Sequence, residues 1–410
     1  YAYDFAGNLT QKQTPKGDTI QYVYDELNRL ISEDLVGVGS TEITYGYDTC
    51  LNGIGRLCGA TTTAVTINHT YDEAGNLKTE TKKISNTSYT TAYTYDYVGN
   101  QLSLTNPNSA KITYTYNIAG LPETASWYAS GATITIMSDL DYAPTGAVTY
   151  QANGNGSSLT NTYDATQLYR LTEKSFATST PFRSYAYTYD SVGNITQIKE
   201  LSGITNTATS TYAYDALYRL PSATLATSTG SSVETFSYSA IGNIATSTGS
   251  GYTYDGNQGG NFANPYAVTQ VASTTYAYDS NGNLILASST AKSITNTWNY
   301  RNELTASEIQ KQVTNPNPLP RFIYQTTDID YAYDPSGQRI SRVTNGFTTL
   351  HYPSPYFNKT TNSGKTVEHI IVNGGPVAAV QGIDTLSPFW IHQDHLGSTS
   401  LVTNESGDVV

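Results

Sequence analysis

A short pattern of aromatic and polar positions, Tyr-x-Tyr-Asp-x-x-Gly-Asn-Leu, recurs along this chain from its first residues to its last third. Tyr276 and Tyr278 of one copy are two residues apart, so their rings lie on one face of an extended strand. Asp279 and Gly282 fit the first and fourth positions of a type I turn, where Gly adopts the left-handed conformation of a three-residue hairpin loop. The leucine after the turn restarts the apolar pattern. The unit is therefore predicted to be a β-hairpin.

Copies of this unit follow one another at a spacing of about 21 to 25 residues, as expected for internal repeats. In most copies an aspartate follows a tyrosine, at Asp4, Asp25, Asp48, Asp72, Asp96, Asp164, Asp190, Asp215, Asp255, Asp279 and Asp334. Degenerate copies place Asn117, Ser239 and Arg301 after a tyrosine. The residues that define the turns most clearly are Tyr24, Asp25, Tyr71, Asp72, Gly75, Tyr95, Asp96, Gly99, Tyr189, Asp190, Gly193, Tyr214, Asp215, Tyr278, Asp279, Gly282, Tyr333, Asp334 and Gly337.

The repeat length predicts the size of the sheet. Two strands of roughly eight residues and two turns fill one repeat, so about 14 hairpins give roughly 28 strands. A sheet that wide does not stay flat, because strand twist makes it curl. The predicted fold class is all-β: tandem hairpin repeats that form a spirally curled sheet.

These residues resemble the YD repeats of bacterial RHS proteins, a family that includes the YD shells of insecticidal toxin complexes and of animal teneurins. The segments 48–58 and 264–268 strengthen the resemblance. So does an RHS core signature formed by His392, Asp394, His395, Leu396, Gly397 and Ser398. The resemblance implies an RHS-type shell or barrel. It also implies hairpin repeats over residues 1–344 and a core region over 345–410 that ends before the family's cleavage motif.

The composition favours an extracellular β-protein over a cytosolic enzyme, since only 13% of the residues are charged and 36 are tyrosine. The net charge of −12 disfavours nucleic acid as a partner. No apolar run approaches the ~20 residues that span a bilayer, so no membrane insertion is expected. The chain begins inside a repeat, at Tyr1, which we interpret as a fragment or a processed product.

The two cysteines, Cys50 and Cys58, are eight residues apart around two glycines that let the chain fold back. A local disulfide is geometrically reasonable and would indicate an oxidising compartment. Two unpaired thiols are the alternative. A metal site is not expected, because no histidine cluster accompanies the two thiols.

Two segments could carry chemistry, and for both a structural role is favoured. Asp334 begins an Asp-Pro-Ser-Gly sequence that resembles the RHS self-cleavage element, yet it also fits a repeat turn with proline at its preferred second position. His392 and Asp394 share one face of a strand and could form an acid–base pair, whereas His395 points to the other face. No catalytic residue and no cofactor is expected.

The resemblance implies that the shell encapsulates or presents its own C-terminal polymorphic toxin, or another cargo domain, for delivery in competition between cells. The alternative is an extracellular structural or adhesive protein, or a fibre, that associates with itself through exposed strand edges. The tyrosine stripe is expected to serve cross-strand packing. Contact with surface glycans is a further possibility for it. Either reading places the protein outside the cell or at the cell surface.

Overall fold

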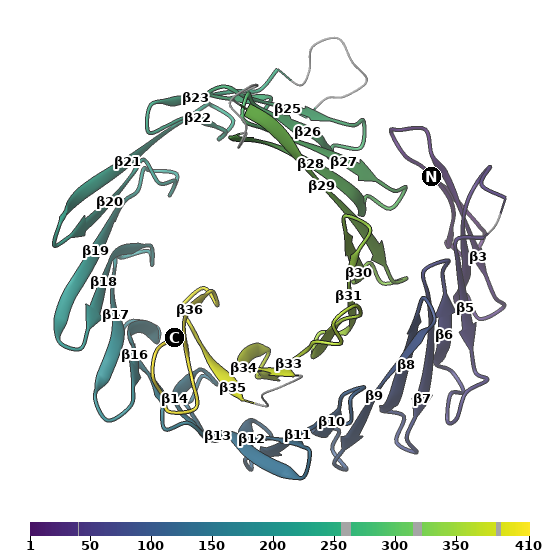
Figure 1. The fold of residues 1–410 in the computed structure, drawn as a ribbon, viewed down its shortest axis with the longest axis horizontal. Helices are drawn as coiled ribbons and strands as arrows, with labels where there is room; N and C mark the ends of the chain where they lie inside the picture. Colours follow the sequence, from purple (N-terminus) through teal and green to yellow (C-terminus); the bar gives the residue numbers. More distant parts are fainter. Residues whose placement is uncertain (40, 256–263, 315–321, 383–386) are drawn as a thin grey trace. The chain divides into compact units, whose positions relative to one another are not determined.

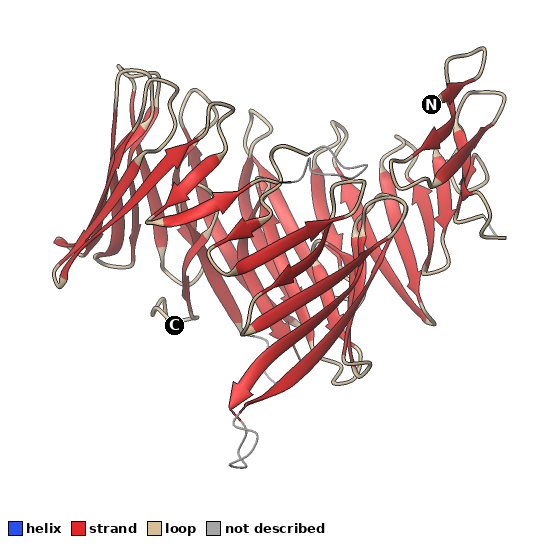
Figure 2. Ribbon diagram, turned by 90° about the horizontal axis from the view of Figure 1, so that it is seen from above, coloured by secondary structure: helices blue, strands red, loops and turns tan. Residues whose placement is uncertain are grey.

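The structure, a computed structural model, describes residues 1–39, 41–255, 264–314, 322–382 and 387–410. Within these ranges every regular helix or strand element is a β-strand (Figure 2). Strands that follow one another in the chain form antiparallel hairpin pairs, for example β3 (Thr19–Tyr24) with β4 (Leu30–Leu35) and β17 (Pro181–Tyr189) with β18 (Ile195–Ser202). The predicted all-β fold of tandem hairpins is confirmed.

The first half of the chain forms β1 (Ala2–Tyr3), β2 (Leu9–Gln13), β3, β4, β5 (Ile43–Tyr47), β6 (Leu57–Thr61), β7 (Val65–Tyr71), β8 (Leu77–Ile84), β9 (Thr87–Tyr95), β10 (Gln101–Thr105), β11 (Lys111–Tyr116), β12 (Pro122–Ala129), β13 (Ala132–Tyr142), β14 (Val148–Asn153), β15 (Ser158–Asp164), β16 (Arg170–Ala177), β17, β18 and β19 (Thr205–Ala213). The second half forms β20 (Ser222–Thr227), β21 (Gly230–Tyr238), β22 (Ile244–Ser247), β23 (Ser250–Thr253), β24 (Gln270–Val271), β25 (Thr274–Tyr278), β26 (Leu284–Ser288), β27 (Lys292–Trp298), β28 (Leu304–Thr314), β29 (Phe322–Tyr333), β30 (Arg339–Thr344), β31 (Thr348–Ser354), β32 (Phe357–Thr360), β33 (Thr366–Val372), β34 (Gly375–Gly382), β35 (Pro388–Gln393) and β36 (Thr399–Thr403).

The described residues contain 36 strands, more than the roughly 28 expected from two per recognised repeat. Six of the additional strands are β31–β36, in the segment where the repeat signature fades. The other two are β13 and β14, which flank a worn turn at Ala143–Gly146. Hairpins therefore also form in segments that lack the Tyr-Asp pair.

The chain divides into two compact units, and each combines an early and a late segment. The first unit comprises residues 1–93 and 251–366, and the second comprises residues 94–250 and 367–410. The predicted division at residue 345 concerns sequence regions and stays a prediction.

The first unit places late strands against early ones, face to face. Its buried apolar cluster draws on β7–β9 for Val65, Ile67, Ile84 and Tyr89, and on the later segment for Ile340 and Phe357. Figure 1 shows β30 and β31 beside β7 and β8. Because alternate side chains of a strand share a face, the inward positions of both layers supply this core.

The second unit repeats this arrangement with other strands. Its largest fully buried side chains include Trp127, Ile136 and Phe176 from the early segment and Ile370 and Trp390 from the late one. The indole N–H of Trp390 donates to the carbonyl of Ile136 at 2.7 Å. β34–β36 accordingly lie alongside β12–β16 in Figure 1.

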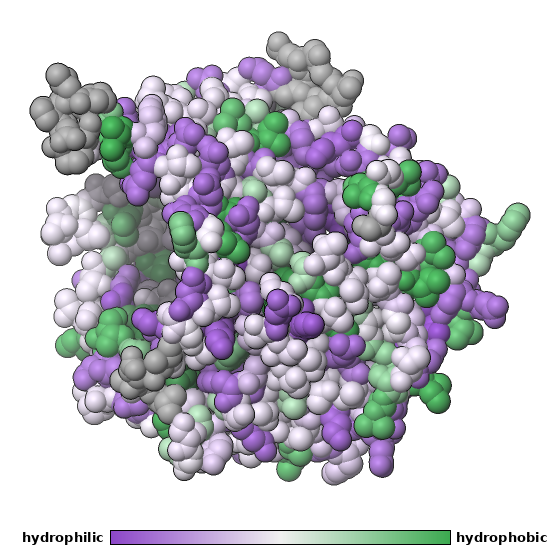
Figure 3. All heavy atoms as spheres, turned by 45° about the vertical axis from the view of Figure 1, so that its right-hand side comes forward, coloured by the Kyte–Doolittle hydropathy of each residue, from purple (hydrophilic) through white to green (hydrophobic). Residues whose placement is uncertain are grey.

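The outer surface is mixed in character. Figure 3 shows polar and weakly polar side chains interspersed with small hydrophobic groups on the face that it presents. Isolated exposed apolar side chains such as Phe5, Ile118 and Ile204 are ordinary on a protein surface. The described residues contain no helix long and apolar enough to span a membrane.

Candidate functional site: the turn ladder and its anchors

The turn that follows a Tyr-Asp pair is closed by its own aspartate. The amide of Asp190 donates to the carbonyl of Asn194 at 3.0 Å, and the amide of Gly193 donates to the carbonyl of Asp190 at 3.2 Å. Asp190 Oδ1 also accepts the amides of Val192 and Asn194, and Asn194 Nδ2 donates to Asp190 Oδ2 at 2.8 Å. The φ of Gly193 is 105°, in the region that favours glycine.

The hydrogen bond between the first and fourth residues of this turn and the left-handed glycine are those expected for the predicted hairpin turn. The hydrogen bond from the side chain of Asn194, followed by those from the backbone, holds the pKa of Asp190 below its ordinary value. The same bond from asparagine to aspartate closes the turns at Asp4, Asp72, Asp96 and Asp279. The turn that follows Asp255 lies outside the described residues.

Two turns with the sequence Leu-x-Arg-Leu, those that follow Asp25 and Asp215, substitute arginine for this asparagine. Arg29 Nε donates to Asp25 Oδ2 at 2.7 Å, and Arg219 Nε donates to Asp215 Oδ2 at 2.8 Å. Asn28 takes the glycine position with a φ of 60°, since asparagine tolerates the left-handed region better than most residues. The two turn sequences are thus chemical alternatives for one geometry.

The tyrosine before the turn joins most of the repeat hairpins to the hairpin before them. Its side chain is partly buried and its hydroxyl donates to a carbonyl of the preceding hairpin, as Tyr189 does to Leu171 at 2.7 Å and Tyr71 to Leu57 at 2.6 Å. The same bond is made by Tyr24, Tyr47, Tyr116, Tyr142, Tyr163, Tyr214, Tyr238 and Tyr278. Sequence reasoning expected this tyrosine to pack but missed the hydrogen bond.

Arginines of the Leu-x-Arg-Leu type extend the connection to the following turn. Arg29 donates two hydrogen bonds to the carboxylate of Asp48, at 3.0 and 2.7 Å, while its guanidinium lies 4.4 Å from the ring centroid of Tyr47. Such a bidentate bond is directional, and the planar guanidinium also stacks on aromatic rings. Arg170, and also Arg56 in the sequence Ile-Gly-Arg-Leu, donate to backbone carbonyls of the next turn. We call the tyrosine and arginine bonds together the turn ladder.

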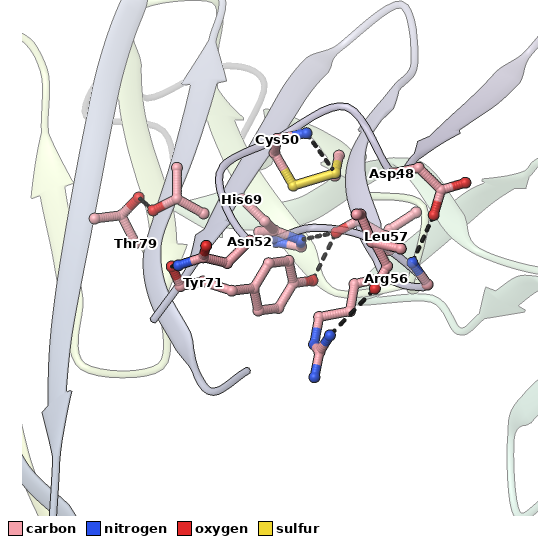
Figure 4. The surroundings of a disulfide bond; sticks show 12 residues. Asp48, Cys50, Asn52, Arg56, Leu57, His69, Tyr71 and Thr79 are labelled. Atoms are coloured by element: carbon pink, nitrogen blue, oxygen red, sulfur yellow. Dashed lines mark hydrogen bonds between the residues drawn. A yellow bond between two sulfur atoms is a disulfide. The ribbon is translucent and has the colours of Figure 1, made fainter. Parts of the chain in front are cut away.

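A disulfide reinforces one step of the turn ladder (Figure 4). Cys50 and Cys58 are bonded, with their Cα atoms 5.4 Å apart. Any Cβ at Gly53 would lie 2.3 Å from Cys50 Sγ, so glycine is required there. The closed loop also touches the next hairpin, because Asn52 Nδ2 donates to the carbonyl of Tyr71 at 3.1 Å. The disulfide thus shapes an enlarged turn that contacts its neighbour.

Asp334 caps a repeat turn and anchors the two layers of the first unit. Its Oδ1 accepts the amides of Ser336 and Gln338, as in the other turns. Its Oδ2 accepts a hydrogen bond from Lys82 Nζ at 2.8 Å, and both side chains are buried. Burial alone would raise the pKa of Asp334, but the hydrogen bonds from Lys82 and Ser336 outweigh it and lower the pKa.

The core signature forms one more turn of the same kind. Asp394 Oδ1 accepts the amides of Leu396 and Ser398, and the amide of Gly397 donates to the carbonyl of Asp394. His395 contacts the ring of Tyr187 at a centroid distance of 4.9 Å. Leu396 is exposed.

His392 is buried on β35. Its Nε2 bonds Thr403 Oγ1 at 2.9 Å, and its ring meets the rings of Phe176 and Phe182 edge-on. Burial first, then the charge of Lys174, lowers the pKa of His392 to about 4. These contacts are the structural use expected of the segment.

One degenerate repeat has a different register from the expected one. The sequence placed Arg301 in the aspartate position after Tyr300, but the turn begins at Asn299, whose Oδ1 accepts the amides of Arg301 and Glu303. Trp298 replaces the tyrosine, and its Nε1 donates to the carbonyl of Leu284 at 2.9 Å. The prediction that Arg301 takes the aspartate position was therefore wrong by two residues. The tyrosine pattern missed Trp298, whose indole N–H makes the bond that a tyrosine hydroxyl makes in the other repeats.

The described residues contain no cluster of three or more His, Cys, Asp or Glu side chains that could hold a metal ion. The remaining anchors come from residues that the sequence did not single out. Tyr89 and His351 share a hydrogen bond of 2.8 Å in the first unit, and Glu368 binds three N–H donors in the second. Their partners are hundreds of residues away in the chain, so no local pattern signals them.

The family model described as teneurin YD-shell matches residues 1–410. The chain belongs to this YD-shell family.

Solved structures of toxin complexes share its fold. The Tc holotoxin pore of Photorhabdus luminescens is similar with a TM-score of 0.80 at 16% identity, over 99% of this chain and 23% of that chain. The TcdB2-TccC3-Cdc42 structure is similar with a TM-score of 0.80 at 17% identity, over 99% and 23% of the two chains. TcdB2-TccC3 without its hypervariable C-terminal region is similar with a TM-score of 0.75 at 15% identity, over 99% and 23%. The chain thus spans about a quarter of the length of these structures. No curated protein matches the sequence.

Proposed function

We propose that this chain is a wall segment of an RHS-type shell that encloses a C-terminal polymorphic toxin for delivery to competing cells. The observation that carries the proposal is the YD-shell family match over the whole chain. The turn ladder gives it a physical basis, because most of the repeat hairpins are bonded to a neighbour by side chains as well as by strand pairing. A wall built in this way resists opening at any single hairpin.

The proposed role is structural rather than enzymatic. The side chains that resemble catalytic groups are engaged in packing. Asp334 is paired with Lys82, Asp394 caps its own turn, and His392 is buried between aromatic rings. A buried, satisfied side chain of this kind stabilises a shell and has no open position for substrate.

The proposal places the protein outside the producing cell or at its surface. The disulfide between Cys50 and Cys58 supports this, because such bonds persist in oxidising compartments. The cargo would be the protein's own C-terminal domain, as in a toxin complex whose shell and toxin belong to one chain.

Limited proteolysis of the protein isolated from its source tests the enclosure. Peptides that follow Val410 should resist protease for as long as the strands of the shell do, and both should be digested together once the shell is unfolded by denaturant. A denatured sample serves as the control for intrinsic cleavage. If peptides beyond Val410 are absent, or are digested before the strands, the proposal is wrong and an adhesive or fibrous role takes its place.

A further inference from the structure

A lysine and an asparagine face each other on the buried side of the hairpin formed by β15 and β16. Asn161 and Lys174 are direct partners in the register of the two strands. Both are buried, with exposed fractions of 7% and 9%. Lys174 Nζ lies 3.4 Å from Asn161 Oδ1, and Asn161 Nδ2 donates to the carbonyl of Val148 at 2.8 Å. The amide plane is therefore held with its carbonyl toward the lysine.

The surroundings of Lys174 remove its amine from water and make the proton easier to lose. Its Nζ lies 5.7 Å from the ring centroid of Phe176, whose ring also packs against His392. Burial lowers the pKa of Lys174, and the charge of Asp394 opposes that effect only in part. A desolvated lysine is the usual form of a nucleophilic one, because only the neutral amine carries a free electron pair.

In a second hairpin, an asparagine at the equivalent strand position faces a residue other than lysine. In β27 and β28, Asn296 pairs with Ser307 in the same register. Asn296 Nδ2 likewise donates to a carbonyl, that of Leu284 at 3.1 Å, and Ser307 Oγ donates to Asn296 Oδ1 at 2.7 Å. The asparagine is thus a recurrent structural element of two hairpins. The lysine is the feature that distinguishes the first of them.

We propose that Lys174 and Asn161 form an isopeptide bond that cross-links β15 to β16. Nζ of the neutral lysine attacks Cγ of Asn161, the new Nζ–Cγ bond forms and the bond from Cγ to Nδ2 breaks. One hydrogen passes from Nζ to the departing nitrogen, which leaves as ammonia, and the other remains as the N–H of the new amide. No oxidant or cofactor is needed. Lys174 Nζ lies 3.4 Å from Asn161 Oδ1, the oxygen bonded to the carbon that it attacks, so the two side chains are already held side by side.

Mass spectrometry of the chain as isolated, with its disulfide reduced, tests the cross-link. The intact mass should be lower than that calculated from the sequence by one ammonia. Proteolysis after Tyr163, Tyr169 and Phe176 separates Asn161 from Lys174 into different peptides. These peptides should be recovered as one branched species, whereas the peptides carrying Asn296 and Ser307 should be recovered as linear species.

A Lys174→Arg variant is the matched control, since it keeps a basic side chain of similar length but should abolish the branched peptide. Closure of an asparagine to a succinimide also releases ammonia, but it leaves linear peptides and persists in the variant. Recovery of Asn161 and Lys174 in linear, unmodified peptides from the native chain would overturn the proposal. That result needs no variant, and it would leave the proposed shell function untouched.

Discussion

Both compact units hold their two layers together through a buried carboxylate, but they satisfy that carboxylate in different ways. In the first unit, Asp334 pairs with one cation, Lys82. In the second unit, Glu368 accepts neutral N–H donors: Trp127 Nε1 at 2.7 Å, Asn106 Nδ2 at 3.3 Å and Asn108 Nδ2 at 2.6 Å. Both carboxylates have relative exposures of 2%.

The two units differ in the groups that offset the free-energy cost of burying the carboxylate. A buried carboxylate that is paired with a cation keeps an uncompensated charge when that cation is lost, even though the turn amides still bind it. A carboxylate with several neutral donors loses only part of its stabilisation when one interaction is weakened. The first unit should therefore be the more sensitive to a single substitution at its anchor.

Replacing Lys82 with methionine should give the largest effect, a loss of about 3–5 kcal/mol in the stability of the first unit. The substitution retains the apolar stem but leaves Asp334 buried without its cation. Chemical denaturation, combined with hydrogen exchange to locate the loss, should show weaker protection of β7–β9 and β29–β32. The strands of the second unit should keep their protection.

The double variant Lys82→Met, Asp334→Asn is the matched control, because asparagine can still accept the turn amides at Oδ1. It should regain much of the stability lost in the single variant, since no buried charge remains. Equal destabilisation of the single and double variants would mean that the ion pair is not what anchors the layers.

Acid should destabilise the second unit through His392. The pKa of this histidine is lowered from 6.5 to about 4, first of all by burial, so the folded form stays neutral while the unfolded chain takes up a proton. Stability is thus retained above pH 6.5 and declines as the pH falls toward 4. The decline amounts to about 3 kcal/mol at most. The groups around the ring are Phe176, Phe182, Lys174 and Thr403.

Unfolding measured by denaturant between pH 7 and pH 4 checks this prediction. A His392→Gln variant keeps a hydrogen-bonding side chain but does not titrate, so its stability should depend less on pH across the same interval. His351 of the first unit also has a lowered pKa, from burial and from Lys359, and contributes a background in both proteins. A variant with the same pH dependence as the native chain would refute the role of His392.

The comparison also shows which features the sequence could predict. The turn at Asp190 follows from five consecutive residues, because aspartate, asparagine and a left-handed glycine determine it locally. Lys82 and Asp334 are 252 residues apart, and nothing in either local pattern identifies the other as its partner. The sequence therefore predicted the hairpins and their turns, whereas the anchors between layers came only from the structure.

The register error at Arg301 has a similar origin. The search for a tyrosine before the turn passed over Trp298, although its indole N–H makes the same bond to the preceding hairpin. A pattern written in residue names fails where a different residue supplies the same donor. The more general signal is an aromatic donor before a residue whose side-chain oxygen can accept the turn amides.

Weakening Glu368 should cost less than removing Lys82. A Glu368→Gln variant keeps the shape and one acceptor oxygen but turns the other oxygen into an N–H donor that opposes Trp127 or an asparagine. We expect a loss of about 2 kcal/mol, the range of hydrogen bonds to charged groups. Hydrogen exchange should show the loss on β10–β12 and β33. A loss equal to that of Lys82→Met would contradict the distinction between the two anchors.

Removing one tyrosine hydroxyl of the turn ladder should give the smallest loss of stability, and the loss should be equal in the two units. Tyr71 and Tyr189 make the same bond of the turn ladder, at 2.6 and 2.7 Å, and arginine guanidinium groups lie 5.6 and 5.7 Å from their ring centroids. Replacing either with phenylalanine keeps the ring and removes the hydroxyl. Each variant should lose about 1 kcal/mol, the net worth of one hydrogen bond.

Denaturation of the two tyrosine variants under one set of conditions measures both losses, and hydrogen exchange assigns each loss to its own hairpin. Equal losses would mean that the units differ only in how their layers are anchored, since the turn ladder then contributes the same amount per step in each. A loss several times larger at one site would mean that the turn ladder is itself uneven. The contrast between Lys82 and Glu368 would then no longer be attributable to the anchors alone.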